Sequence, residues 1–407
     1  MLPAMTSYND DNPLSYWLAT APAFEADAPL PDRAQVVVVG GGVFGACAAL
    51  HLARAGADVL LVERGGLASG ATGRNAGILS PGTTEDYLAT RAQLGTDTAR
   101  AVWAFTEDGA AGLRALLAEE GIDADFRAEG SYTAALSAEE AAAHQATVEQ
   151  LARDGFALDW FDRDALQARV GTPLAPTWRG ARFNPRGGVL HSGQMVRGVA
   201  RAAVRHGARV AQGVAVADVR GGVVQTDQGD IQADEVVLTT NAYTGSVYPG
   251  LAGVIEPVRG QIRATVPLAQ CIFPGAWSAN AGGEYWQQTA DGTWVLGGMR
   301  RVAADAERGY TSNALRAEVQ AALDRFAAEN FPALADAPVA YRWGGIMGFT
   351  PDANPLIGPL ERGVWVAAGC TGHGMPFAAE AGRQMALWLC GGGPDRDMSP
   401  FDPARFG

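Results

Sequence analysis

The sequence predicts an α/β protein of two domains, in which an antiparallel sheet is inserted into a mainly parallel one. Three observations predict this arrangement. Residues 36–63 have the pattern of strand, glycine-rich turn, helix and second strand. Far along the chain, the uninterrupted run VVLTT at 236–240 is typical of another buried parallel strand. Between the two ends of the chain, residues 254–300 alternate between polar and apolar as antiparallel strands do.

Composition excludes several classes of function. The 407 residues are 48% hydrophobic, which is enough for a large core. The net charge of −13 offers no field that attracts nucleic acid or anionic lipid, so we expect neither as a partner. The chain contains no lysine, which excludes a pyridoxal enzyme built on a lysine Schiff base. Four scattered cysteines without C-x-x-C spacing predict no metal site and no disulfide framework.

The start of the chain predicts a cytoplasmic protein. Residues 1–31 lack a basic start followed by an apolar block, so we expect no secretory signal. The uncharged run Val36–Leu50 is followed by His51 and Arg54, and a membrane span needs about 20 apolar residues. We therefore expect no stable membrane insertion.

The opening unit carries the most specific motif. Gly40, Gly42 and Gly45 give the spacing G-x-G-x-x-G directly after a β-branched run. The glycines allow a tight turn, close approach of the backbone to a pyrophosphate, and close packing of helix on strand. The helix N-terminus offers N–H groups and the positive end of its dipole to phosphates. Glu63 ends the second strand, where a carboxylate can accept hydrogen bonds from a ribose. The unit is predicted to bind a dinucleotide.

The segment Arg64–Gly82 is rich in glycine, serine, threonine and asparagine. By itself it could be a solvated linker. Its position after the ribose-binding acid favours a loop along the ligand, because its glycines permit close backbone approach and its polar side chains can bond to phosphate or ring atoms.

The remaining pattern divides the chain into an arm and two interleaved domains. Helices are expected over 87–120, 138–153, 187–210, 312–330 and 375–390. The arm, with Tyr16 and Trp17 as an aromatic anchor, is assigned to 1–34; the nucleotide-binding domain to 35–120, 187–250 and 340–407; and the substrate domain to 121–186 and 251–339.

Six segments then give a specific resemblance: residues 36–63, ASGATGRNAG, VVLTTNAYTG, EPVRGQI, WGGIMGFTPDANPLIG and AAGCTGHG. In this order they resemble the FAD-dependent D-amino-acid oxidase superfamily, which includes glycine oxidase and sarcosine oxidase. The SYW arm, GRNAG and YWQQTADG look most similar to the gamma-glutamylputrescine oxidoreductase branch. The resemblance implies a Rossmann-like FAD-binding domain with an inserted antiparallel-sheet substrate domain.

The resemblance also implies the site residues. FAD would be bound by Gly40, Gly42, Val43, Phe44, Gly45, Glu63, Arg64, Ser69, Ala71, Thr72, Arg74, Asn75, Ala76, Gly77, Val216, Gly345, Gly369, Gly372, His373, Gly374 and Met375. Val216 would meet the adenine, and the turn at 369–375 would meet the flavin edge where the last helix begins. The candidate catalytic residues are His373, Tyr285, Arg300 and Met347, with Trp286, Tyr341 and Trp343 as further pocket candidates. Arg259 is expected to pair within the fold.

Departures from the family pattern refine these expectations. Some relatives attach flavin through a histidine or a cysteine where this chain has Arg74 and Gly345, so FAD is expected to be non-covalent. The basic residues that relatives use to grip a substrate carboxylate are replaced by Met347, Gly372 and Pro376. An amine, or an amino acid bound differently, therefore fits better than a simple α-amino acid. Without lysine, both oxidase and dehydrogenase behaviour stay open.

The expected reaction is oxidation of a carbon–nitrogen bond of a small amine or amino acid to an imine. A single dinucleotide motif implies one nucleotide cofactor, so electrons would pass to oxygen or to another acceptor. The alternatives are an FAD-binding subunit of a multi-component dehydrogenase, a D-amino-acid dehydrogenase, and a nicotinamide-dependent dehydrogenase. The sequence does not predict an oligomeric state.

Overall fold

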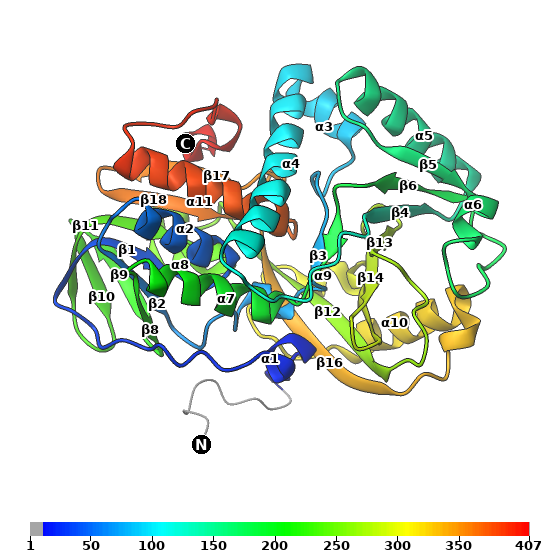
Figure 1. The fold of residues 1–407 in the computed structure, drawn as a ribbon, viewed down its shortest axis with the longest axis horizontal. Helices are drawn as coiled ribbons and strands as arrows, with labels where there is room; N and C mark the ends of the chain where they lie inside the picture. Colours follow the sequence, from blue (N-terminus) through cyan, green and yellow to red (C-terminus); the bar gives the residue numbers. More distant parts are fainter. Residues whose placement is uncertain (1–10, 407) are drawn as a thin grey trace.

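Two eight-stranded sheets lie side by side in the computed structural model, which describes residues 11–406 (Figure 1). The first sheet has the order β17-β18-β11-β1-β2-β8, with β10 and β9 continuing from β11. Its strands are β1 (Arg33–Val39), β2 (Val59–Glu63), β8 (Arg209–Gln212), β9 (Val216–Arg220), β10 (Val223–Thr226), β11 (Ile231–Leu238), β17 (Leu356–Glu361) and β18 (Val364–Ala368). β1 runs parallel to both β2 and β11, so the two predicted buried strands are neighbours.

Helices cover one face of the first sheet. They are α2 (Val43–Arg54), α4 (Thr96–Glu119), α7 (Ser192–Arg205) and α11 (Met375–Cys390). α11 packs closely on α2. The two helices leave so little room that a β-carbon on Gly382 would lie 2.7 Å from the carbonyl carbon of Cys47. α4 crosses α11 just as closely, because a β-carbon on Gly109 would lie 1.9 Å from the carbonyl oxygen of Pro376. The first and last thirds of the chain therefore share one core.

The second sheet is mainly antiparallel and has the order β16-β12-β15-β14-β13-β4-β6-β5. Its strands are β4 (Ser131–Ala135), β5 (Asp159–Asp162), β6 (Gly180–Asn184), β12 (Glu256–Pro267), β13 (Ala276–Ala279), β14 (Glu284–Gln288), β15 (Thr293–Gly298) and β16 (Val339–Phe349). One face packs a tryptophan-rich core against α10 (Ala317–Asn330). The opposite face is turned toward the N-terminal arm and the loop that follows β2.

The remaining elements are short or peripheral. They are α1 (Tyr16–Thr20), α3 (Tyr87–Leu94), α5 (Ala138–Arg153), α6 (Arg163–Gln167), α8 (Thr244–Val247), α9 (Ala304–Glu307), β3 (Ile78–Leu79), β7 (Gly188–Val189), and the 3-10 turns η1 (Ala71–Arg74), η2 (Asn241–Tyr243), η3 (Pro249–Leu251), η4 (Arg300–Ala303), η5 (Pro332–Leu334), η6 (Ser399–Phe401) and η7 (Pro403–Phe406).

The predicted helices are present, with three changes in their limits. The helix expected over 187–210 spans only Ser192–Arg205, because β7 precedes it and β8 begins at Arg209. The helix expected over 87–120 is divided at Gly95, whose φ of 85° no helix can continue through. The helix expected from residue 312 begins at Ala317. One domain assignment is wrong: residues 340–349 were placed with the nucleotide-binding domain, but they lie in β16, which pairs with β12 in the second sheet. The other domain boundaries stay predictions.

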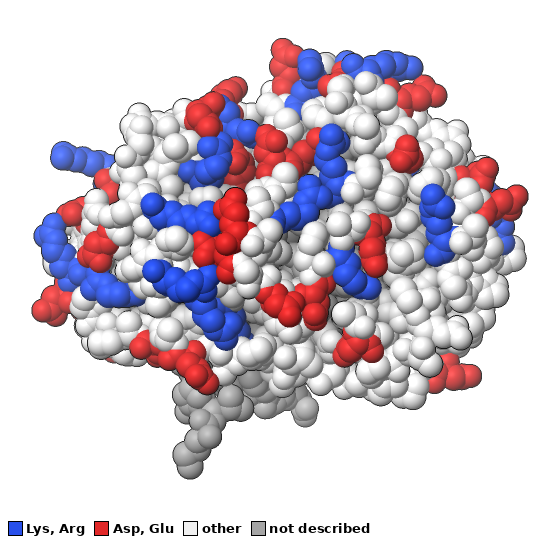
Figure 2. All heavy atoms as spheres, in the orientation of Figure 1, with Lys and Arg blue, Asp and Glu red and all other residues white. Residues whose placement is uncertain are grey.

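The surface mixes charges of both signs, and Figure 2 shows acidic and basic side chains interleaved on one face. At the end of α4, Glu120 accepts hydrogen bonds from Arg54 of α2 and from Arg205 of α7. These cations lower the pKa of Glu120 to about 2, although burial alone would raise it. The ends of three helices are thus joined by one carboxylate. Within residues 11–406, no helix is both long enough and apolar enough to span a bilayer.

Candidate active site

The glycine-rich turn lies where β1 passes into α2, at the carboxyl end of the parallel strands. Two of its glycines are required by the fold. Gly40 has a φ of 113°, and a β-carbon on Gly45 would lie 1.9 Å from the carbonyl oxygen of Gly40. Gly42 is different: its φ of −86° suits any residue, and a β-carbon there would approach only Thr72 Oγ1, at 3.2 Å. Because protein packing does not demand glycine at 42, the open space beside it fits the close approach of a ligand.

The first turn of α2 offers hydrogen-bond donors beside this space. Gly42 is its N-cap and has no side chain to cap the helix. The N–H of Val43 donates to Thr72 Oγ1 at 3.1 Å. The N–H groups of Phe44 and Gly45 find no acceptor within residues 11–406. This end of the helix is therefore suited to a pyrophosphate.

Glu63 stands at the end of β2 and organises the neighbouring loop. Its carboxylate accepts hydrogen bonds from the N–H of Gly41 at 2.7 Å and of Gly65 at 2.9 Å, and lies 3.4 Å from Ser69 Oγ. A carboxylate has about four acceptor positions, so one more remains for a ribose hydroxyl. Next to it, the guanidinium of the exposed Arg64 lies 3.9 Å from the centre of the Tyr243 ring. Val216 begins β9 and is half-buried, and its contact with adenine stays a prediction.

Arg74 is buried and its side chain bonds within the protein. Its Nε donates to the carbonyl oxygen of Ser69 at 3.1 Å, and its Nη1 donates to that of Gly344 at 2.9 Å. A β-carbon on Gly345 would lie 2.8 Å from Cβ of Arg74, so the two positions at which the sequence resemblance implies flavin attachment in some family members lie against each other. Neither an arginine nor a glycine provides the nucleophile that such an attachment needs.

The C-terminal turn between β18 and α11 is held by both sheets. The N–H of Gly369 donates to Asn241 Oδ1 at 3.0 Å, and that of Thr371 donates to the carbonyl oxygen of Gly348 in β16 at 2.8 Å. Thr371 has a φ of 47°, a strained conformation for a β-branched residue that these bonds maintain. The turn places Gly372, Gly374 and the N-terminus of α11 beside the second sheet.

His373 lies in this turn and is uncharged at neutral pH. Burial lowers its pKa to about 4, and its Nδ1 lies 3.4 Å from Thr84 Oγ1. His373 therefore supplies no positive charge to the site at neutral pH. A neutral imidazole can still accept a hydrogen bond.

One face of the second sheet closes the site. Side chains alternate between the two faces of a strand, and the register of the second sheet places Tyr285 of β14 and Met347 of β16 on the same face. That face is turned toward the loop at 64–82 and the turn at 369–375, which we call the cofactor loops. A β-carbon on Gly260 would lie 3.0 Å from Met347 Cε and 3.5 Å from the Tyr285 hydroxyl. A β-carbon on Gly372 would lie 3.3 Å from Met347 Sδ. Met347 therefore bridges the sheet and the C-terminal turn.

The other residues predicted to line the pocket do not all lie on this face of the second sheet. The prediction for Trp286 is wrong, because it is fully buried on the opposite face, against α10. Trp343 is on the correct face but is also fully buried, and its Nε1 donates to the carbonyl oxygen of Arg74 at 2.9 Å. Arg300 lies beyond the strands with its guanidinium 5.3 Å from the centre of the Phe349 ring. Tyr341 is half-buried and packs edge-on against Tyr16.

Sequence reasoning missed two residues that support the site. Gln287 is two residues after Tyr285 and so shares its face; its Nε2 donates to the carbonyl oxygens of Ala76 and Gly77. The two-residue spacing was the available signal. Asn241, which holds the C-terminal turn, gave no such signal, because a single asparagine after a strand is a common turn residue.

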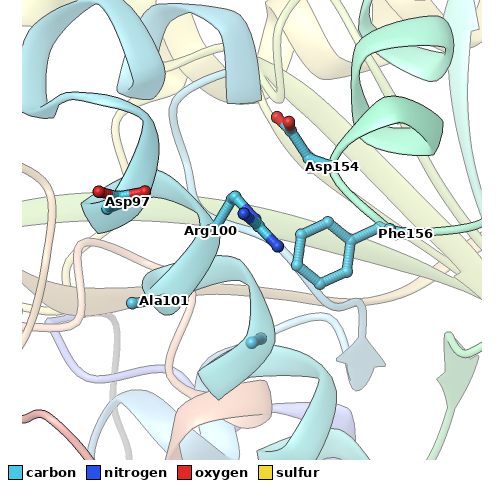
Figure 3. Close-up of a pocket in the computed structure, with 7 residues that line it drawn as sticks. Asp97, Arg100, Ala101, Asp154 and Phe156 are labelled. Atoms are coloured by element: carbon cyan, nitrogen blue, oxygen red, sulfur yellow. The ribbon is translucent and has the colours of Figure 1, made fainter.

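A separate hollow of about 470 Å³ lies on the surface between α4 and the segment after α5 (Figure 3). Figure 3 shows Arg100 of α4 pointing toward the ring of Phe156. None of the residues that line it belongs to the cofactor loops: Asp97, Arg100, Ala101, Ala104, Asp154, Gly155 and Phe156. The hollow is broadly open and is not part of the site described above.

The chain is similar in sequence to known proteins. The chain is 30% identical to the gamma-glutamylputrescine oxidoreductase of Escherichia coli (strain K12) over 406 residues, covering 95% of this chain and 90% of the relative. It is 30% identical to a glycine oxidase of Pseudomonas aeruginosa over 389 residues, covering 91% and 98%.

The fold also matches solved structures. The L-proline dehydrogenase of P. horikoshii superposes with a TM-score of 0.78 at 24% identity, covering 93% of this chain and 98% of that one. The glycine oxidase of Geobacillus kaustophilus gives 0.76 at 24% identity, covering 91% and 98%. The profile of the FAD dependent oxidoreductase family, DAO, matches residues 35–388, which is most of the chain. This protein belongs to the DAO family of FAD-dependent oxidoreductases.

Proposed function

We propose that this enzyme oxidises a carbon–nitrogen bond of an amine to an imine, and that a simple α-amino acid is not its preferred substrate. When bound, FAD supplies the acceptor for the two electrons and the hydrogen removed from the carbon next to nitrogen. The protein binds and orients the substrate and excludes water. The relatives named above support the reaction type, since their names include an oxidoreductase of gamma-glutamylputrescine and glycine oxidases.

The observation that favours an amine is the direction of the arginines on the second sheet. Arg259 points away from the site and donates to both carboxylate oxygens of the buried Glu307. Arg263, two residues later, also points away and pairs with Asp324. Met347 instead occupies the site face, at the position where the sequence resemblance implies an arginine in glycine-oxidase-like members. Arg259 and Arg263 are thus unable to grip a substrate carboxylate from this face.

The residues on the site face suit an amine. The ring of Tyr285 can contact an alkylammonium group, a contact worth about 0.5–2 kcal/mol. Met347 offers a flexible apolar surface for an alkyl chain. His373, neutral at pH 7, is our candidate for accepting a hydrogen bond from the substrate nitrogen. Arg300, beside the ring of Phe349, is our candidate for binding a distant acidic group of a longer substrate.

Anaerobic reduction of the bound flavin tests this proposal. Purified protein would be mixed without oxygen with primary amines, secondary amines and α-amino acids matched in length, and the visible flavin band would be followed. We expect amines to bleach the band and the matched amino acids to do so far more slowly. Bleaching by amino acids alone would indicate an amino-acid dehydrogenase or oxidase. A yellow protein that no compound bleaches would favour an FAD-carrying subunit of a larger complex.

A second measurement identifies the electron acceptor. After reduction by the best amine, the protein would be mixed either with oxygen or with an artificial electron-accepting dye. Rapid recovery of colour in oxygen indicates an oxidase, and recovery with the dye alone indicates a dehydrogenase.

A further inference from the structure

The loop that follows η1 has an unusual arrangement of hydrogen bonds. Five consecutive carbonyl oxygens, from Gly73 to Gly77, each accept a hydrogen bond from a side chain. The donors are Ser15 Oγ to Gly73 (2.5 Å), Trp343 Nε1 to Arg74 (2.9 Å), Trp17 Nε1 to Asn75 (2.5 Å), and Gln287 Nε2 to Ala76 (2.5 Å) and Gly77 (2.9 Å). No regular secondary structure holds residues 75–77, so these side chains determine how the peptide groups are turned.

Fixing a carbonyl also fixes the next N–H. A trans peptide is planar, and its C=O and N–H point in opposite directions. When the carbonyls of Arg74 and Asn75 are held by indole donors, the N–H groups of Asn75 and Ala76 must point the other way. Within residues 11–406 these two N–H groups find no acceptor, although Ala76 is almost fully buried. Buried N–H groups are normally satisfied, so they are suited to an acceptor atom of a bound ligand.

Two of the four donor side chains come from the N-terminal arm, which is held firmly. Trp17 is fully buried, and its carbonyl oxygen would lie 2.5 Å from a β-carbon on Gly193, the second residue of α7. Thr20 Oγ1 lies 2.8 Å from Nε2 of His191. Figure 1 shows α1 where the two sheets meet, and the arm then passing from α1 along the lower edge of the molecule toward β1. The arm is therefore a fixed part of the structure at this position.

We propose that Ser15 and Trp17 are positioning residues for the cofactor. By holding the carbonyl of Asn75, Trp17 keeps the N–H of Ala76 available to bound FAD. By holding the carbonyl of Gly73, Ser15 fixes the start of the same loop. The N-terminal arm thus affects FAD binding indirectly, through the loop at 73–77. This role concerns FAD alone and does not depend on which amine is oxidised.

A pair of substitutions on adjacent residues of α1 tests the proposal. Trp17→Phe removes the indole N–H and keeps an aromatic ring, which leaves the Asn75 carbonyl buried without a donor. Tyr16→Phe is the matched control, because it removes a hydroxyl that lies instead near Thr289 and Asp291. FAD would be removed from each protein, and the dissociation constant for FAD would be measured by fluorescence titration of the apoprotein. Ser15→Ala provides a second arm variant if Trp17→Phe does not fold.

We expect Trp17→Phe to raise the dissociation constant for FAD by roughly fivefold or more, the equivalent of losing one hydrogen bond. We also expect the visible spectrum of the bound flavin to shift, which a simple loss of stability would not cause. Tyr16→Phe should leave both unchanged. The proposal is overturned if both arm variants bind FAD like the wild type with the same spectrum, or if Tyr16→Phe weakens binding equally. Wild-type protein that binds no FAD at all would instead refute the cofactor assignment.

Discussion

The ring of Phe44 lies against Gly374: its Cε2 atom is 3.2 Å from the place that a β-carbon would occupy on Gly374. Phe44 is in the first turn of α2, and Gly374 is the N-cap of α11. The N-termini of two helices from opposite ends of the chain therefore meet, and each carries the partial positive charge of a helix dipole. Bound FAD carries negative charge on its pyrophosphate and gains more when it is reduced. This contact explains why both ends of the sequence are needed to build one cofactor site.

Gly42 and Gly45, in the glycine-rich segment where β1 passes into α2, should respond differently to substitution. Gly42→Ala adds a methyl group where only Thr72 Oγ1 is near, so the apoprotein should fold with a melting temperature close to that of the wild type. It should nevertheless lose much of its flavin, and Gly42→Val should be colourless. Gly45→Ala forces a clash with the carbonyl oxygen of Gly40 and should destabilise the fold itself. Flavin content and apoprotein melting curves, measured together, separate the two effects; normal flavin content in Gly42→Val would refute the assignment.

The buried ion pair that orients Arg259 should be important for stability. Glu307 is fully buried and accepts hydrogen bonds from Arg259, Gln261 and Arg316. Glu307→Gln leaves a buried guanidinium without its counter-charge, and breaking such a pair costs about 3–5 kcal/mol. Denaturant unfolding would measure this loss. The double variant Arg259→Met with Glu307→Gln should recover part of it, since the fully buried arginine is gone and only the partly exposed Arg316 loses its partner; a double variant less stable than Glu307→Gln would contradict this explanation.

Local patterns explain why part of the site was predictable. The turn at Gly40–Gly45 and the acid at Glu63 belong to one continuous unit whose residue types are fixed by its own backbone. The helix that begins at Met375 was located correctly because glycine and proline mark its start.

Long-range pairing explains what was not predictable. The pattern of β16 does not reveal whether it joins the first or the second sheet, because either partner would bury its apolar residues. The bonds from Ser15 and Trp17 to the cofactor loop join segments about 60 positions apart, with no local signal. The error at Trp286 was avoidable: adjacent residues in a strand point to opposite faces, so Tyr285 and Trp286 cannot line the same wall.

Because Met347 and Trp286 lie on opposite faces of the second sheet, their substitution yields a prediction about substrate binding. Met347→Ala removes the side chain that bridges the sheet and the turn at Gly372, and should lower kcat/KM for the best amine by about tenfold or more. Trp286→Phe changes a larger residue in the same sheet but on the opposite face, so it should reduce stability and leave kcat/KM nearly unchanged. Steady-state kinetics on folded, flavin-loaded proteins would compare them. Equal losses of kcat/KM would show that Met347 acts only through the packing of the sheet.

The last prediction concerns His191, the N-cap of α7. Its Nδ1 accepts a hydrogen bond from the N–H of Gln194 at 3.2 Å, so the neutral ring carries its proton on Nε2, which faces Thr20 Oγ1. Burial lowers the pKa of His191 from 6.5 to about 4. The unfolded chain therefore takes up a proton at a higher pH than the folded chain. The stability contributed by the neutral ring is complete above about pH 6.5 and is lost as the pH falls toward 4.

His191→Asn should reduce this loss. Asparagine keeps an acceptor for the N–H of Gln194, because it is among the preferred N-cap residues, but it does not titrate. The free energy of unfolding, measured by denaturant at pH 7 and at pH 5, should fall less in the variant than in the wild type. His191→Ala should also remove the pH dependence of this site, but at a cost of about 1 kcal/mol at pH 7 for the lost cap. If His191→Asn loses as much stability between pH 7 and pH 5 as the wild type, protonation of His191 does not contribute. The acid sensitivity then arises from other groups, which include the half-buried His51 and His373, whose pKa values burial lowers to about 4, and His144, whose pKa burial also lowers.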